Sequence, residues 1–109
     1  MNFEEYQKKS RKTAIYPGAG SNFYYPTLGL AGEAGEVANK VKKVMRDRDN
    51  KVDEEFKESI KEELGDVLWY VSQIATELGL TLDEIVEKNI EKLYSRMERG
   101  KLGGSGDRR

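Results

Sequence analysis

The sequence contains neither cysteine nor histidine among its 109 residues. The absence of cysteine excludes disulfide frameworks, thiolate nucleophiles and iron–sulfur clusters. The absence of histidine excludes Ser-His-Asp triads, imidazole general bases, the usual zinc sites and the Glu-x-x-His pattern of ferritin-like di-iron proteins. Any chemistry here must therefore use carboxylates, Lys, Arg, hydroxyl groups or a hard metal ion.

Long apolar runs are also absent. No segment reaches the ~18 consecutive apolar residues that a membrane span needs, and residues 1–6 lack the charged-then-apolar pattern of a secretory leader. We therefore expect a cytoplasmic protein with no membrane partner. The formal net charge of −1 argues against a general nucleic-acid binder, which would carry a basic face.

The composition is rich in charge and poor in core-forming residues. Hydrophobic residues make up 37% of the chain and charged residues 36%, against about 25% charged in typical domains. The length fits one domain, and a domain this small buries only roughly two-thirds of its unfolded surface. We therefore expect an oligomer in which subunit contacts supply part of the missing burial.

The apolar periodicity is helical almost throughout and has no period-two segment. It predicts helices over residues 3–14, from Pro26 to about residue 45, over 54–78, and from about 82 to 99. Asp53 is the expected N-cap of the third helix, Gly79 its end, and Thr81 the start of a capping box. The short turn after the third helix predicts that it lies antiparallel to the fourth, in an all-α four-helix bundle. We expect a domain over residues 1–100 and a flexible Gly-rich tail over 101–109.

Apolar stripes on the second and third helices are the expected core. Trp69 falls opposite the stripe of the third helix, on a face shared with Gln73. An apolar residue left over on that face predicts a second interface.

Two pairs of acids at i, i+3 spacing are the features that carry chemistry: Glu33 with Glu36 and Glu63 with Asp66. Each pair places like charges on adjacent turns of one helix face, at some cost in stability. If the apolar stripes of the two helices pack together, the four acids approach one another, and divalent cations are the simplest counter-charge. Oxygen ligands favour Mg²⁺ when phosphate oxygens complete its coordination. The alternative is that these acids lie on ordinary solvated faces.

Residues 29–37 and 62–70, which contain these pairs, resemble the ExxE…ExxD signature of the MazG-type all-α nucleoside triphosphate pyrophosphohydrolases. The resemblance extends over nearly the whole chain, to the small single-domain members. It implies a MazG-type fold, a (deoxy)nucleoside triphosphate substrate, and hydrolysis to the monophosphate and pyrophosphate. It also implies that four acids are catalytic and hold Mg²⁺, or Mn²⁺ as a substitute: Glu33, Glu36, Glu63 and Asp66.

The resemblance further implies that the fourth helix contributes phosphate or nucleotide contacts, through Asn89, Lys92 and Arg96. An ordinary solvated helix face is the alternative. Tyr16 and Phe23 are the candidates to contact the nucleoside, and a packed loop without a base contact is the alternative there. Similar proteins are dimers or tetramers with sites near subunit boundaries, so the same is expected here.

Two other functions compete with this hypothesis. A non-catalytic helical regulatory or assembly protein would use the acids to bind a basic partner. A diphosphatase acting on dUTP and dUDP would keep the enzyme class but change the leaving group. The sequence leaves the base preference open.

Overall fold

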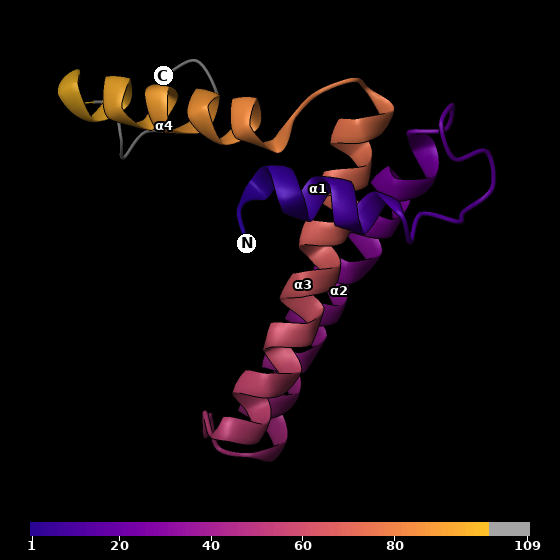
Figure 1. Ribbon diagram of the computed structural model, residues 1–109. Helices are drawn as coiled ribbons and strands as arrows, with labels where there is room; N and C mark the ends of the chain where they lie inside the picture. Colours follow the sequence, from indigo (N-terminus) through magenta and orange to yellow (C-terminus); the bar gives the residue numbers. More distant parts are fainter. Residues whose placement is uncertain (101–109) are drawn as a thin grey trace.

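The computed structural model describes residues 1–100, which form four α-helices and no strand. The predicted tail over 101–109 lies outside the described residues. The helices are α1 (Phe3–Arg11), α2 (Tyr24–Asp47), α3 (Glu54–Glu77) and α4 (Leu82–Glu98), shown in Figure 1. The prediction of an all-α chain with four helices is confirmed.

The predicted ends of α3 and the start of α4 are also confirmed. Asp53 accepts a hydrogen bond from the backbone N–H of Phe56 at 2.9 Å. Gly79, at φ 71°, follows the end of α3 in the left-handed conformation that glycine tolerates best. Thr81 and Glu84 form both hydrogen bonds of the capping box.

Two other helix ends differ from the prediction. α1 stops at Arg11 rather than Ala14, because the Thr13 hydroxyl donates to the carbonyl of Ser10 and the backbone turns there. α2 starts at Tyr24, two residues before Pro26, and Pro26 is fully buried in its first turn. Pro26 fits this position because it lacks an N–H, and the first N–H groups of a helix have no acceptor within the helix.

α2 and α3 form a long antiparallel arm, joined by the turn over residues 48–53, and they share the most extensive helix–helix contact of the molecule (Figure 1). Gly29 on α2 permits the close approach at the inner end of this arm. A Cβ atom at Gly29 would lie 2.1 Å from a ring atom of Tyr70 on α3. The tyrosine ring therefore packs directly on the backbone of α2.

α4 does not fold back along α3, so the predicted antiparallel pairing of these helices and the four-helix bundle are wrong for the single chain. α1 crosses α3, and α4 contacts α1 while leading away from the arm (Figure 1). The reason lies in Gln7 of α1, whose side chain donates to the carbonyl of Leu80 and accepts from the N–H of Leu82, both at 2.9 Å. These bonds fix the turn before α4 to α1.

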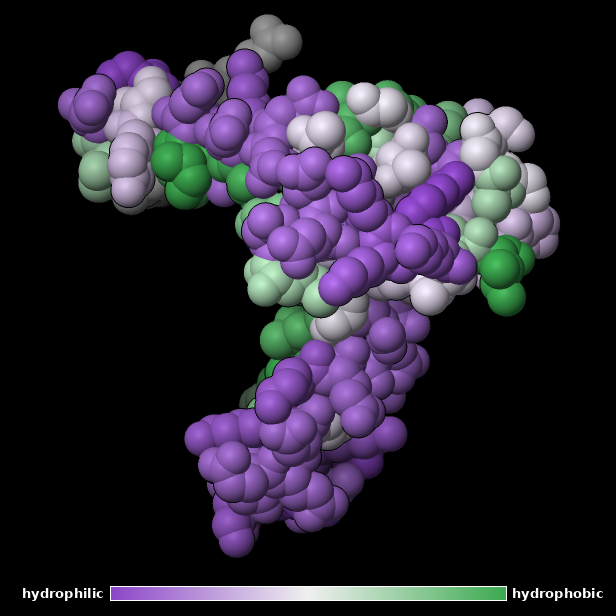
Figure 2. All heavy atoms as spheres, viewed as in Figure 1, coloured by the Kyte–Doolittle hydropathy of each residue, from purple (hydrophilic) through white to green (hydrophobic). Residues whose placement is uncertain are grey.

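The described chain is extended and its core is small. The Cα radius of gyration is 16.7 Å, against about 13 Å for a compact domain of this length. Many large apolar side chains remain exposed, and Figure 2 shows hydrophobic groups on the surface in the angle between α4 and the arm. None of the helices within residues 1–100 combines the length and apolarity needed to cross a bilayer.

Candidate metal centre

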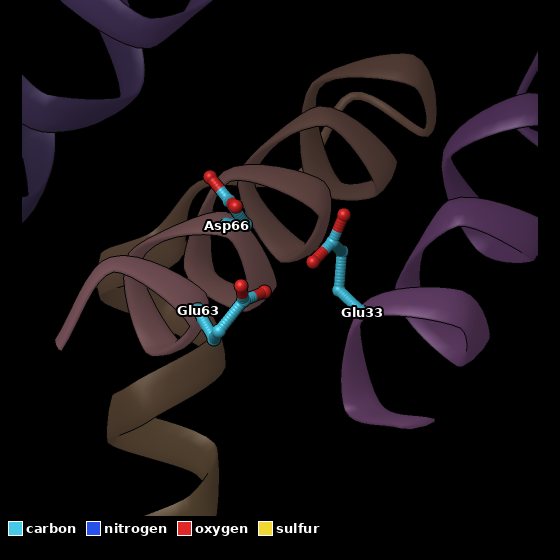
Figure 3. A group of neighbouring side chains, drawn as sticks. All are labelled: Glu33, Glu63 and Asp66. Carbon is cyan, nitrogen blue, oxygen red and sulfur yellow. The ribbon is translucent and has the colours of Figure 1, made fainter. Parts of the chain in front are cut away.

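Three carboxylates from two helices converge near the inner half of the arm. Glu33 of α2 faces Glu63 and Asp66 of α3, and one oxygen from each lies within 4.8 Å of the other two. Figure 3 shows the three side chains pointing into the space between the helices. The sequence-based expectation that acids of both helices approach one another is therefore met for these three residues.

The local structure explains the convergence. Glu63 and Asp66 lie one turn apart on the same face of α3. Glu33 lies one turn beyond Gly29, where Tyr70 rests against the backbone of α2. The close packing at Gly29 thus sets α2 near enough for Glu33 to reach the acids of α3.

The electrostatics of the cluster favour a cation. Desolvation raises the pKa of Glu33, and its hydrogen bond with Glu63 and the nearby charges of Asp66, Glu63 and Glu36 raise it further. Crowded carboxylates of this kind are stabilised by a proton or by a bound cation. Three hard oxygen ligands fit Mg²⁺ or Mn²⁺, which take carboxylates together with water or phosphate oxygens.

Glu36, the fourth predicted acid, is not among the three that converge. It is exposed on the next turn of α2. Glu36 and Glu63 both line a groove of about 430 Å³ between α2 and α3, which runs from the cluster toward the tip of the arm. The groove therefore adjoins the candidate metal centre.

Lys40 is a neighbour of the cluster that the sequence analysis missed. Its ammonium lies 3.6 Å from an Oε1 of Glu63 and donates a hydrogen bond to Ser59 at 2.5 Å. The i, i+4 spacing from Glu36 to Lys40 is the signal in the sequence that could have identified it. Lys40 thus provides positive charge at the edge of the acidic cluster.

The candidate phosphate-binding residues of α4 do not approach the cluster within one chain. α4 contacts α1 rather than the arm, and Asn89 and Lys92 are exposed on it. Arg96 is buried, with 4% of its surface exposed. These three residues and the acidic cluster therefore lie on separate parts of the described chain.

The two candidate nucleoside contacts have different surroundings. Tyr16 is buried, stacks on Tyr25 with ring centroids 5.0 Å apart, and donates its hydroxyl to Glu77. Phe23 stacks on Tyr24 and is 40% exposed. Tyr16 therefore holds the loop after α1 in place, as the packed-loop alternative predicts. The ring of Phe23 remains accessible.

Trp69 does not form the predicted second interface. Its indole N–H donates to Thr13 at 2.8 Å, and its ring packs edge-on against Tyr16 and Tyr70. Gln73, on the same face, is fully buried. The face of α3 opposite its apolar stripe is therefore covered by α1 and the following loop of the same chain.

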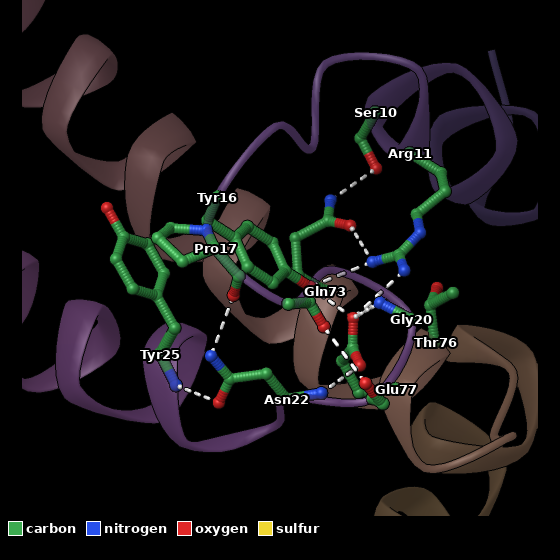
Figure 4. Close-up of polar contacts among 12 residues, drawn as sticks. Ser10, Arg11, Tyr16, Pro17, Gly20, Asn22, Tyr25, Gln73, Thr76 and Glu77 are labelled. Carbon is green, nitrogen blue, oxygen red and sulfur yellow. Dashed lines mark hydrogen bonds and ion pairs between the residues drawn. The ribbon is translucent and has the colours of Figure 1, made fainter.

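Glu77 is the centre of a second polar cluster that the sequence analysis did not identify (Figure 4). Its carboxylate accepts hydrogen bonds from the hydroxyl of Tyr16, the N–H groups of Gly20 and Asn22, and Arg11. Burial alone would raise the pKa of Glu77, but these hydrogen bonds outweigh it and lower the pKa to about 2. The cluster fixes the aromatic loop to the end of α3.

The chain is similar in sequence to a known domain family and to two known proteins. The sequence profile of the MazG nucleotide pyrophosphohydrolase domain matches residues 26–100. The Gene 37 protein of Mycobacterium phage L5 is 47% identical over the full length of both chains. The uncharacterized protein YvdC of Bacillus subtilis is 34% identical over 63% of this chain and 70% of its own length.

No solved structure shows a significant match to the chain. The profile match nevertheless spans most of α2, all of α3 and α4, and every residue of the acidic cluster. The chain therefore belongs to the MazG nucleotide pyrophosphohydrolase family.

Proposed function

We propose that this protein is a metal-dependent pyrophosphohydrolase that converts a (deoxy)nucleoside triphosphate to the monophosphate and pyrophosphate, in control of the nucleotide pool. The observation that carries the proposal is the convergence of Glu33, Glu63 and Asp66 from two helices within 4.8 Å. Membership of the MazG family supports the same reaction class.

The residues present fit a hard divalent cation, and each has a definite task. Glu33, Glu63 and Asp66 would hold Mg²⁺ or Mn²⁺, with Glu36 beside them on α2. The bound cation supplies charge neutralisation and activation of a water molecule. Because the chain has no histidine, a carboxylate would orient the water and accept its proton, and Glu33, Glu36 and Glu63 are the candidates.

We propose a dimer or tetramer as the working form. Leu64 and Leu68 of α3 are 48% and 49% exposed, and α4 has no helix of the same chain along most of its length. A neighbouring subunit that covers these surfaces would also bring Asn89 and Lys92 toward an acidic cluster. Their amide and ammonium groups suit contacts with the base and with phosphate oxygens.

Hydrolysis assays with a panel of nucleoside triphosphates and diphosphates test the proposed reaction. With Mg²⁺ we expect equimolar monophosphate and pyrophosphate from at least one NTP or dNTP, loss of turnover with EDTA, and recovery with Mg²⁺ or Mn²⁺. Release of single phosphate would contradict the proposed bond cleavage. Hydrolysis of dUDP as well as dUTP would instead support the diphosphatase, and binding of a basic partner without any turnover would support the regulatory protein.

The first mutational prediction concerns Asp66. We expect Asp66→Asn to lower turnover and Mn²⁺ affinity by at least about 100-fold, because loss of a supporting residue beyond the ligands already costs 10–100-fold. Glu58→Gln is the matched control, since Glu58 is an exposed acid on the same helix that pairs with Lys61. Kinetics and calorimetric Mn²⁺ titration measure both effects, with helicity as a check on folding. An Asp66→Asn protein with control-like turnover would refute the metal assignment.

A further inference from the structure

Lys40 has two structural features to which the proposed function assigns no role. Its ammonium contacts Glu63, a member of the three-acid cluster, and it lines the groove that adjoins this cluster. The side chains of Lys40 and Glu63 are 33% and 18% exposed, so solvent screens their interaction only in part. The position of Lys40 therefore affects the charge of the cluster directly.

Without a bound cation, Lys40 is the counter-charge of Glu63. The ammonium also donates to Ser59, which lies one turn before Glu63 on α3. Two contacts on one helix thus hold the lysine against α3 across the groove. A divalent cation bound by Glu63 would take over the role of this counter-charge and repel the ammonium.

Once released from Glu63, the ammonium of Lys40 lies beside the groove between α2 and α3. The groove between α2 and α3 begins at Glu36 and Glu63. Lys40 and Lys43 line it on the α2 side, and Asp47, Arg48 and Glu55 line it near the tip of the arm. A phosphate chain whose reacting end lies at the acidic cluster can extend into this groove. An ammonium beside it would bind a phosphate oxygen as a point charge.

We infer that Lys40 is a positioning residue that holds Glu63 before a cation binds and then contacts the phosphate chain of the substrate. The first half of this inference rests on the metal site of the proposed function, and the second half rests on its nucleotide substrate as well. The inference predicts effects of opposite sign when the charge of Lys40 is removed. Cation affinity rises because a competing positive charge is lost, and nucleotide affinity falls because a phosphate contact is lost.

The first arm of the test measures Mn²⁺ binding by calorimetry with no nucleotide present. We expect Lys40→Met to bind Mn²⁺ about tenfold more tightly, because a unit charge within about 4–6 Å alters an ionised site by roughly tenfold or more and solvent partly screens this pair. Lys40→Arg should stay near the wild-type affinity, because it keeps the charge. Lys61→Met is the matched control: Lys61 is two residues from Glu63 but pairs with Glu58 on the outer face. Unchanged or weaker Mn²⁺ binding by Lys40→Met would overturn the counter-charge role.

The second arm measures binding of an α,β-imido nucleoside triphosphate to the protein saturated with Mg²⁺. We expect Lys40→Met to weaken this binding about 10- to 100-fold, the range for a lost hydrogen bond to a charged group. Lys61→Met should bind like the wild type. Unchanged nucleotide binding by Lys40→Met would overturn the phosphate contact. A wild-type protein that binds Mn²⁺ but no nucleotide would overturn the phosphate contact and the proposed function together, while the first arm would still decide the counter-charge role.

Discussion

At the scale of single residues, two carboxyl groups show how surroundings decide the role of an acid. Glu33 lies among other carboxylates, which together with desolvation raise its pKa and favour a bound cation. The Glu77 side chain is only 1% exposed but receives four hydrogen bonds, which lower its pKa to about 2. The first arrangement suits ligand binding, and the second stabilises the fold.

The second prediction concerns the pH dependence of stability at Glu77. Its pKa is about 2 in the folded protein and 4.5 in the absence of these interactions, so ionised Glu77 stabilises the folded state above pH 4.5. A difference of this size corresponds to roughly 3 kcal/mol. We expect Glu77→Gln to lower the free energy of unfolding by about that amount at pH 7.

Urea unfolding at several pH values measures this effect. The difference between wild type and Glu77→Gln should shrink as the pH falls from about 4.5 toward 2, because the wild-type carboxylate becomes protonated. Glu87→Gln, at an exposed position of α4, is the control and should change stability little at any pH. A difference for Glu77→Gln that stays constant from pH 7 to pH 2 would contradict the assigned ionisation.

At the scale of helices, the glycines of α2 differ in their surroundings: one packs against another helix and two face open space. Gly29 is covered by the ring of Tyr70, whereas a Cβ at Gly32 or Gly35 would meet nothing within 4 Å. All three glycines weaken the helix by similar amounts in principle. Only Gly29 is explained by a contact within the described chain, and the other two face open space.

The third prediction compares alanine at two of these glycines. We expect Gly29→Ala to destabilise the protein by about 1–3 kcal/mol, because the new methyl group displaces the Tyr70 ring and separates α2 from α3. Gly32→Ala should instead stabilise it by up to ~1 kcal/mol through helix propensity. Thermal unfolding measures both variants. Equal stability of Gly29→Ala and wild type would show that the close contact between α2 and Tyr70 is wrong.

At the scale of the whole molecule, the surface is too large for a compact monomer. The chain exposes 8015 Å², against about 6,100 Å² expected for its mass. The excess of about 1,900 Å² is more than twice the roughly 800 Å² that each partner buries in a standard protein–protein interface. Exposed apolar side chains on α3 and α4 account for part of it. This comparison supports the proposed oligomer.

The fourth prediction tests that oligomer at Leu68, which is 49% exposed on α3. Sedimentation of the wild type should give a dimer or tetramer, and Leu68→Glu should give monomers at micromolar concentration, because a buried unpaired charge is costly. Lys61→Glu, at an exposed polar position of the same helix, should keep the wild-type assembly. A Leu68→Glu protein that sediments like the wild type would exclude this surface from the interface.

Much of this protein was determined by its sequence alone. Apolar spacing of 3.6 residues gave four helices, and local capping at Asp53 and Thr81 gave two of their ends, because these signals act within a few residues. The spacing of Glu63 and Asp66 placed both acids on one face for the same reason. The acid pairs and their neighbouring glycines also indicated the family.

The tertiary structure decided what depends on long-range contacts. Gln7 fixes the turn before α4 to α1, 75 residues away from Leu82 in sequence, and so directs α4 away from α3. Trp69 and Gln73 are covered by a segment some 60 residues earlier in the chain. Lys40 became a neighbour of Glu63 only when α2 and α3 packed together. Helix periodicity fixes which residues share a face, but the packing of distant segments fixes what that face meets.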